Sequence, residues 1–282
     1  MPMSFKPLPF FKMGSLGNCY IFIEAKNVEK YSLKKLAKEV SDTSMGIGAD
    51  GLIIVDTAKP PFKMRILNRD GSPAEMCGNG IRQAALFLKS LRYPSRKKFL
   101  LVLPAGKFEA EVVSVKGSHA KIRTALGPPD FSAKAVGLIN HDGLAFGIKM
   151  KYGQRKILAD CVSIGNPHAI ISVNNFDFDW QGAGYYICHC SLFPDGVNVH
   201  FLKAINHKCF EMRTYERGTG VTKACGSGAA ACLAVGVIRG LLHRKAVAVT
   251  EGGKLELDWD FTTGMIGQTG PADIICKGVF LG

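Results

Sequence analysis

The sequence predicts an α+β fold with two pseudo-symmetric lobes, each a curved and mostly antiparallel sheet, or half-barrel, wrapped around a central helix. Three observations lead to this prediction. Strand patterns alternate with helical patterns through the 282 residues, of which 47% are hydrophobic and can fill a sizeable core. The turn signal Gly127-Pro128-Pro129-Asp130 separates two halves of similar pattern. A Cys-Gly-x-Gly sequence also occurs once in each half, directly before an apolar helical pattern.

Apolar periodicity predicts the elements of the first half. Helices are expected at residues 33–40 and 81–91, where apolar residues recur every three or four positions. Alternating or continuous apolar runs, separated by turn signals, predict strands at residues 20–24, 51–55, 62–68, 100–103, 107–115 and 120–125.

The second half repeats this alternation. One helix is expected at residues 229–242. Strands are expected at residues 146–151, 156–164, 169–173, 197–202, 209–215, 246–250 and 254–259. A final strand, residues 274–280, follows a break at Gly270-Pro271.

The charge and the hydropathy exclude several classes of protein. The net charge is +13, but the basic residues are scattered and are not interleaved with aromatic residues as in a base-stacking surface. We therefore favour a solvated basic surface that attracts anionic substrates over nucleic-acid binding. No apolar run approaches the length of a membrane span, and the N-terminal sequence is not typical of a secretory signal. A cytoplasmic protein is expected.

The nine cysteines indicate neither disulfides nor a metal. An odd number of cysteines without an export signal argues against a disulfide framework. Cys188-His189-Cys190 lacks the wider spacing and the second ligand pair of a zinc site, so no metal is expected. Cys161, Cys209, Cys232 and Cys276 lie in apolar runs and are expected to be buried.

Cys77 and Cys225 differ from the others because each precedes a predicted helix. The glycines of Cys-Gly-[Asn/Ser]-Gly allow a sharp turn and close approach of a ligand to the backbone. A helix start offers free N–H groups that suit a carboxylate, and it favours thiolate over thiol. Asn79 and Ser227 are candidate N-caps. Two such loops, half a chain apart, suggest thiols on opposite sides of a cleft. One sulfur would take a proton from a carbon acid and the other would return one, which inverts the stereocentre.

Several further motifs accompany these two loops in order. They are Phe11-Lys12-Met13 with Leu16-Gly17-Asn18, Asn68-Arg69-Asp70-Gly71-Ser72, Met76-Cys77-Gly78-Asn79-Gly80, Gly165-Asn166-Pro167-His168, Tyr215-Glu216-Arg217-Gly218 and Ala224-Cys225-Gly226-Ser227-Gly228. The ordered set resembles the diaminopimelate epimerase family over nearly the whole chain. The resemblance implies a cofactor-independent isomerase of lysine biosynthesis that interconverts LL- and meso-diaminopimelate, usually as a homodimer. It also implies that the last strand returns to the first lobe, so that the lobes are residues 1–126 with 271–282, and residues 127–270.

The resemblance also implies roles for individual residues. Cys77 and Cys225 would be the acid/base pair, supported by Glu216 and His168. The substrate-binding residues would be Asn18, Asn68, Gly78, Asn79, Asn166, Asn198, Glu216, Arg217, Gly226 and Ser227. Amide and guanidinium donors suit carboxylates, and the Glu216 carboxylate suits an ammonium group. Arg217 and Glu216 are adjacent, so we expect Gly218 to break the strand if both serve one pocket.

Some positions depart from the family pattern and leave alternatives open. Cys19 stands where the family commonly has an acidic residue, which places a third thiol near the expected site and removes a carboxylate that would orient His168. Val221 replaces a further acidic residue. The alternatives are a cofactor-independent racemase of another amino acid and, from a different class, a non-catalytic basic binding protein.

Overall fold

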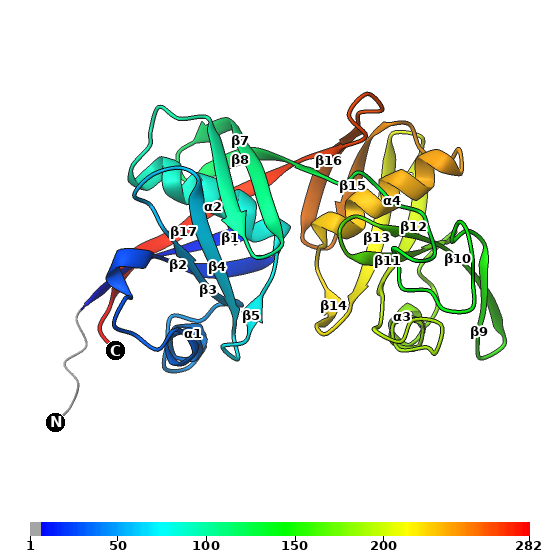
Figure 1. The fold of residues 1–282 in the computed structure, drawn as a ribbon, viewed down its shortest axis with the longest axis horizontal. Helices are drawn as coiled ribbons and strands as arrows, with labels where there is room; N and C mark the ends of the chain where they lie inside the picture. Colours follow the sequence, from blue (N-terminus) through cyan, green and yellow to red (C-terminus); the bar gives the residue numbers. More distant parts are fainter. Residues whose placement is uncertain (1–6) are drawn as a thin grey trace. The chain divides into compact units, whose positions relative to one another are not determined.

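The computed structural model describes residues 7–282 and is a mixed α/β structure made mostly of strands, with four α-helices (Figure 1). The chain divides into two compact units. The first unit extends to Thr124 and also includes the C-terminal segment Gly270–Gly282. The second unit is Ala125–Thr269. None of the helices between residues 7 and 282 combines the length and the apolar composition of a membrane-spanning segment.

The sheet of the first unit closes on itself. Its strands are β1 (Leu8–Ser15), β2 (Asn18–Glu24), β3 (Gly51–Val55), β4 (Phe62–Asn68), β5 (Pro73–Ala74), β6 (Lys98–Leu103), β7 (Gly106–Lys116), β8 (His119–Leu126) and the last part of β17 (Ile266–Phe280). The neighbours run β17, β1, β2, β3, β4, β6, β7, β8, and β8 pairs with β17 again. The β2–β3 and β4–β6 pairs are parallel. The short strand β5 pairs with β4.

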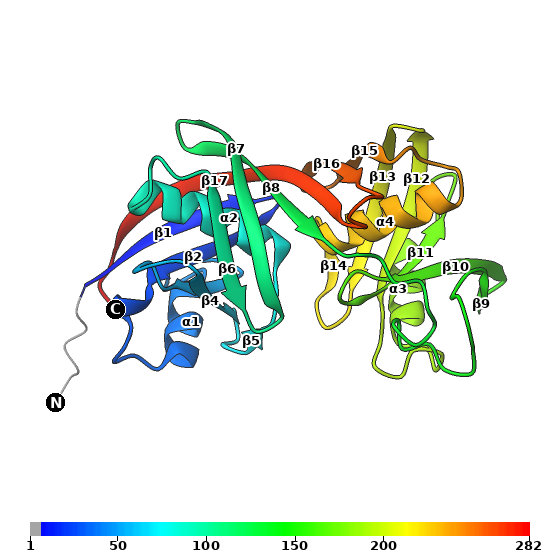
Figure 2. The same ribbon diagram turned by 45° about the horizontal axis from the view of Figure 1, so that its top comes forward.

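Helix α2 (Gly78–Leu91) fills the inside of this sheet, because its residues from Asn79 to Leu88 are all buried (Figures 1 and 2). Helix α1 (Leu33–Ser41) packs with its buried face on the outer side of the strands. Strand β2 separates the two layers by alternation. Tyr20 and Phe22 join the apolar cluster around α2, whereas Ile21 and Ile23 join the cluster around α1. A strand covered on both faces explains its continuous apolar run.

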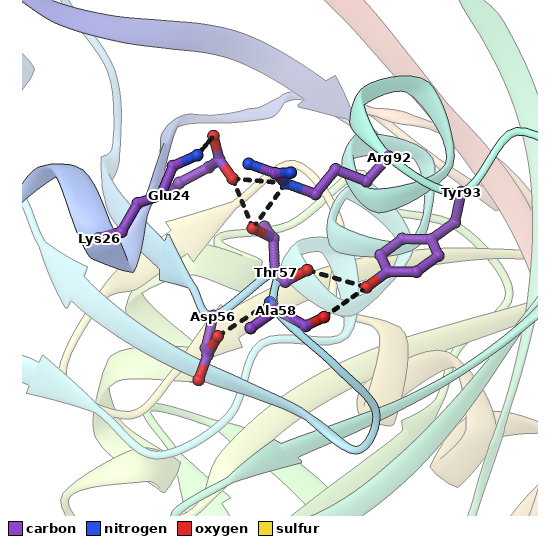
Figure 3. Close-up of polar contacts among 7 residues, drawn as sticks. All are labelled: Glu24, Lys26, Asp56, Thr57, Ala58, Arg92 and Tyr93. Atoms are coloured by element: carbon purple, nitrogen blue, oxygen red, sulfur yellow. Dashed lines mark hydrogen bonds and ion pairs between the residues drawn. The ribbon is translucent and has the colours of Figure 1, made fainter.

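A polar cluster anchors the C-terminal end of α2 to the end of β2 (Figure 3). The Arg92 Nε donates to Glu24 Oε2 at 2.9 Å and to Thr57 Oγ1 at 3.1 Å, and Thr57 also donates to that carboxylate at 2.5 Å. The Tyr93 hydroxyl donates to the Thr57 or Ala58 carbonyl oxygen. The far end of the helix is therefore held by charge-assisted hydrogen bonds, which stiffen α2 as a support for the residues at its start.

The second unit repeats the same pairing order. Its strands are β9 (Ile148–Tyr152), β10 (Arg155–Ser163), β11 (Pro167–Ser172), β12 (Asn198–Asn206), β13 (Cys209–Glu216), β14 (Gly220–Thr222), β15 (Lys245–Thr250), β16 (Gly253–Trp259) and the first part of β17. From β10 to β17 the successive pairs are antiparallel, parallel, antiparallel, parallel, antiparallel and antiparallel. From β1 to β8 the successive pairs follow the same sequence. The strands β5 and β14 occupy matching places, each just before a Cys-Gly-x-Gly loop.

The helices of the second unit also correspond to those of the first. Helix α4 (Gly226–Ile238) is buried from Gly226 to Gly236 and contacts β10, β11, β12 and β16. Helix α3 (Trp180–Cys188) packs against the other face of the strands, where Ala169 and Val199 join its cluster. Because side chains alternate along a strand, His168, Asn198 and His200 lie on the face of α4.

The structure corrects several expected boundaries. Both central helices begin three residues earlier than predicted, and α4 ends at Ile238 rather than at residue 242. The predicted break at Gly270-Pro271 is wrong, because β17 is one continuous strand from Ile266 to Phe280. Its pairing with β16 ends at Thr269 and its pairing with β1 begins at Asp273, so Pro271, which lacks an N–H, lies where neither ladder requires a donor.

Four other elements were not predicted: β1, the short strands β5 and β14, and helix α3. Helix α3 contains Gly182 and Gly184, which weaken a helical pattern. Tertiary packing requires Gly184, since a Cβ there would lie 2.8 Å from Tyr215 Cβ. Among the cysteines expected to be buried, Cys161 and Cys232 are buried, but Cys209 is only half-buried and Cys276 is exposed.

Candidate active site: two cysteines at helix starts

Cys77 is itself the N-cap of α2. Its backbone is extended, with φ −147° and ψ 113°, and its Sγ accepts a hydrogen bond from the Gly80 N–H at 3.3 Å. Asn79, which we expected to cap the helix, is instead its second residue. The side chain of Cys77 is half-buried at the positive end of a buried helix. A sulfur that accepts an N–H bond at a helix start is in a setting that favours thiolate.

The structure brings Asn18 and Asn79 together beside Cys77. Asn79 Nδ2 donates to Asn18 Oδ1 at 2.6 Å, and Arg82 Nη2 donates to Asn79 Oδ1. Asn18 follows a two-residue hairpin turn, Leu16-Gly17, in which both residues have positive φ (51° and 85°). This turn is what directs Asn18 toward the start of α2.

Asn68 and Cys19 lie elsewhere in the first unit. Asn68 is at the exposed end of β4, where its Nδ2 donates to Ser72 Oγ at 3.0 Å, as in an ordinary turn. Cys19 packs with the cluster around α1, and its N–H donates to Asp50 Oδ2 at 2.7 Å. It therefore points to the face of β2 opposite Asn18 and Tyr20. The expectation that Cys19 adds a third thiol beside Cys77 is not supported.

Cys225 is the N-cap of α4 in the same way. Its Sγ accepts from the Gly228 N–H at 3.4 Å and lies 3.5 Å from Ser227 Oγ. Ser227 is again a residue of the first turn and not the expected cap. Cys225 is more buried than Cys77, with 6% exposure. A Cβ on Gly228 would lie 2.2 Å from the His200 ring, so only glycine fits at this point of the helix.

Glu216 stands beside Cys225 and opposes its ionisation. Burial raises the pKa of Cys225 well above its ordinary value, and the negative charge of Glu216 raises it further. The Cys225 thiol donates a hydrogen bond to Glu216, and Thr222 Oγ1 donates to Glu216 Oε1 at 2.6 Å. Burial also raises the pKa of Glu216. The environment of Cys225 thus favours the thiol, the opposite of the environment of Cys77.

His168 belongs to a buried hydrogen-bonded chain. Its Nε2 lies 2.9 Å from Asn166 Oδ1 and its Nδ1 lies 2.9 Å from His200 Nε2; His200 Nδ1 lies 3.1 Å from Thr214 Oγ1. Burial lowers the pKa of His200 to about 3 and, with the charges of His200 and Arg217, lowers the pKa of His168 well below its ordinary value. Both rings are therefore neutral and fully engaged near pH 7.

Arg217 and Asn198 form a turn at the end of β13. The strand ends at Glu216, and Gly218 has φ 79°, so the chain breaks where we expected it to. Asn198 Oδ1 accepts from the Arg217 N–H at 3.0 Å and Asn198 Nδ2 donates to the Pro167 carbonyl at 2.9 Å. Arg217 Nη1 donates to the Asp195 carbonyl at 2.8 Å. Its Nε and Nη2 remain available to a ligand, because no residue of the described chain accepts from them.

Sequence reasoning missed four polar residues around the two helix starts: Arg82, Gln83, His200 and Gln268. All four are fully buried. Gln83 Nε2 donates to the Asn18 carbonyl at 3.3 Å. The Gln268 amide is 3.0 Å from where a Cβ of Gly226 would lie, and neither of its polar atoms has a hydrogen-bond partner in the described chain. Arg82 and Gln83 were detectable as two polar residues next to the apolar run from Ala84 to Leu88 of the same helix.

No group of three or more His, Cys, Asp or Glu side chains between residues 7 and 282 is arranged to hold a metal ion.

Comparison with known proteins agrees with the motifs. The sequence profile described as diaminopimelate epimerase matches residues 10–132 and 161–275. The diaminopimelate epimerase of Halothermothrix orenii is 36% identical over 277 residues, which cover 96% of this chain and 97% of that protein. The diaminopimelate epimerase of Geobacillus kaustophilus is 35% identical over 284 residues, with 96% of each chain covered.

Solved structures show the same fold at low sequence identity. A PhzF-family phenazine biosynthesis protein of Bacillus anthracis has a TM-score of 0.69 at 14% identity, covering 98% of this chain and 99% of that chain. A hydroxyproline epimerase of Agrobacterium vitis, crystallised with trans-4-hydroxy-L-proline, has a TM-score of 0.68 at 14% identity, with 99% and 92% covered. With the profile match and full-length relatives above 30% identity, this chain belongs to the diaminopimelate epimerase family.

Proposed function

We propose that this chain inverts one α-carbon of diaminopimelate, LL to meso and back, by moving protons between that carbon and the sulfurs of Cys77 and Cys225. The activity is that of an isomerase of lysine biosynthesis, as in the full-length relatives named diaminopimelate epimerase. The observation that carries the mechanism is the pair of matching helix starts. In each unit a cysteine caps a buried helix and its sulfur accepts the third N–H.

In one direction, the Cys77 thiolate removes the α-proton and the Cys225 thiol donates a proton to the opposite face. The electron pair of the broken C–H bond moves into the carboxylate as an enediolate and returns to form the new C–H bond. Cys77 ends as the thiol and Cys225 as the thiolate, so the reverse reaction exchanges their roles. The developing negative charge requires donors, which Gly78, Asn79, Gly226 and Ser227 supply from the two helix starts.

The distal end of the substrate would be held by the residues around Arg217. Its free Nε and Nη2 suit a bidentate carboxylate, and Asn166 and Asn198 keep amide N–H groups that the protein does not fully use. Asn18 and Asn68 would contribute from the first unit. Glu216 would accept a hydrogen bond from an ammonium group of the substrate, either in place of its hydrogen bond with Cys225 or in addition to it. His168 acts by orienting Asn166, because both of its ring nitrogens are already engaged.

This mechanism requires two pseudo-symmetric lobes, residues 1–126 with 271–282 and residues 127–270, that place both sulfurs at one cleft. The matching strand order within the two units supports their pseudo-symmetry. A homodimer and a cytoplasmic location remain predictions, which light scattering and cell fractionation test.

The test is a stereoisomer assay in deuterated water. LL-diaminopimelate should convert to the meso form with deuterium at one α-carbon, whereas simple L-amino acids should exchange little. Cys77→Ala and Cys225→Ala should each abolish conversion. The matched control is Cys276→Ala, since that thiol is exposed on β17 and plays no part in the proposal. Undiminished conversion by either single variant would contradict the two-thiol scheme. Deuterium at both centres of the meso product formed at low conversion, before the reaction reverses, would contradict the distal clamp.

A further inference from the structure

Arg82 is a fully buried charged side chain beneath the start of α2. Its Nη2 donates to Ser15 Oγ at 3.1 Å and to Asn79 Oδ1. Its Nε and Nη1 have no hydrogen-bond partner in the described chain. A guanidinium is costly to bury unless a negative charge compensates it. The surroundings of Arg82 therefore need to supply an anion.

The first unit offers no buried carboxylate for this purpose. Within the described residues of that unit, no Asp or Glu is buried. The side chains that β1, β2, β6 and β7 pack against α2 are apolar, apart from Ser15, Asn18 and Tyr20. Burial lowers the pKa of Arg82 to about 10, so that it stays charged at neutral pH, and the charge of Cys77 acts in the opposite direction. The Cys77 sulfur is thus the acidic group that faces this cation.

Helix geometry explains why Arg82 reaches the catalytic loop. Side chains on a helix tilt toward its N-terminus, and residues three apart are neighbours on one face. Arg82 therefore extends back over Asn79 toward Cys77. The equivalent position of α4, five residues after its cysteine, is Ala230. The second helix start has no such cation and instead has Glu216 as a neighbour of its cysteine. The two matching thiols consequently lie in opposite electrostatic environments.

We propose that Arg82 is a positioning residue with two tasks: its buried charge holds Cys77 as the thiolate in the free enzyme, and its Nη2 hydrogen bond fixes the Asn79 amide. With Oδ1 of Asn79 occupied by Arg82, the amide nitrogen must face Asn18, as it does at 2.6 Å. The free enzyme is then poised with Cys77 as base and Cys225 as acid. The catalytic meaning of this inference rests on the proposed two-thiol function, but the charge state of Cys77 is measurable without turnover.

The test measures alkylation of each cysteine by iodoacetamide between pH 5 and 10, using peptide mass spectrometry on the intact, folded chain. Two substitutions separate the tasks of Arg82. Arg82→Gln keeps a donor for Asn79 and loses the charge, whereas Arg82→Lys keeps the charge. We expect Arg82→Gln to move the midpoint of Cys77 alkylation upward by about 1 pH unit or more, and Arg82→Lys to leave it within about half a unit of the wild type.

Cys225 in the same samples is the internal control, and its profile should move much less than that of Cys77. Circular dichroism confirms that each variant is folded, and Arg82→Met, which also removes the charge, carries the test if Arg82→Gln is not folded. In that case a raised Cys77 midpoint supports the inference and a wild-type midpoint overturns it. An unchanged Cys77 midpoint in Arg82→Gln, or equal shifts in both variants, would also overturn it. Failure to epimerise diaminopimelate with an unaltered Cys77 profile would instead count against the proposed function.

Discussion

The close contact between His200 and the first turn of α4 predicts a large effect of Gly228→Ala. An added Cβ would lie 2.2 Å from His200 Cε1, 2.5 Å from Nε2 and 2.7 Å from Nδ1, whereas ordinary contacts begin at 3.4 Å. The ring would have to move by about 1.2 Å. The His200 ring is fully buried, and both of its nitrogens are hydrogen-bonded, to His168 and Thr214. It therefore cannot move away from the added Cβ without breaking a hydrogen bond or displacing packed neighbours.

The same substitution in the first unit should be almost harmless. A Cβ on Gly80 would lie 2.9 Å from Ile53 Cδ1 and 3.3 Å from Met64 Cε, which are the ends of flexible apolar side chains. Overpacking costs about 1 to 3 kcal/mol and more where the neighbour is rigid, and alanine gains about 1 kcal/mol over glycine within a helix. We therefore expect a loss of about 2 to 3 kcal/mol for Gly228→Ala and a change near zero for Gly80→Ala.

Urea unfolding, followed by circular dichroism at constant pH, measures both values. The double variant Gly228→Ala with His200→Ala should recover about 2 kcal/mol relative to the sum of the single effects, because removal of the ring relieves the clash. If Gly228→Ala and Gly80→Ala differ by less than about 0.5 kcal/mol, or if the double variant shows no coupling, the argument from the His200 contact is refuted.

Three further predictions concern charges and protons. Glu216→Gln removes the negative charge beside Cys225, so the midpoint of Cys225 alkylation should fall by about 1 pH unit while the Cys77 midpoint stays unchanged; an unmoved Cys225 midpoint would rule out this role of Glu216. Burial alone would raise the pKa of Glu24, but hydrogen bonds from Thr57 and Arg92, with the charge of Arg92, lower it overall (Figure 3). A carboxylate with a lowered pKa stabilises the fold above its unfolded value of 4.5 and loses this effect as the pH falls through the folded value. Glu24→Gln should thus cost about 1 to 2 kcal/mol at pH 7 and progressively less below pH 4.5, whereas Glu109→Gln in an exposed pair with Lys98 should cost under about 0.5 kcal/mol. A loss that stays constant down to pH 3 would contradict the ionic explanation. Finally, Thr222→Val removes the hydrogen bond that positions the Glu216 carboxylate, so kcat should fall severalfold, with a smaller effect on substrate affinity. An unchanged kcat would argue against the Thr222–Glu216 hydrogen bond as support for Cys225.

Apolar periodicity was sufficient to predict most of the helices and strands whose buried residues follow the regular period of the element. The strands at Gly51–Val55 and Phe62–Asn68 were predicted exactly, because their continuous or alternating apolar runs come from faces covered by α1 and α2. The elements that were missed depend on partners distant in sequence. Helix α3 contains Gly184, which the contact with Tyr215 requires, and β17 continues through Pro271 because its two ladders meet at that point.

The sequence alone determined the chemistry available to this protein: two Cys-Gly-x-Gly loops before apolar helices, and the ordered motifs that identify the family. A local pattern encodes these features, because glycine freedom, helix starts and apolar periodicity depend on neighbours in the chain. Only the tertiary structure decided which groups surround each thiol. Arg82 beneath one helix start, Glu216 beside the other, and Cys19 on the far face of its strand all follow from strand pairing and packing. Charge interactions depend on spatial distance, which the spacing along the chain does not reveal.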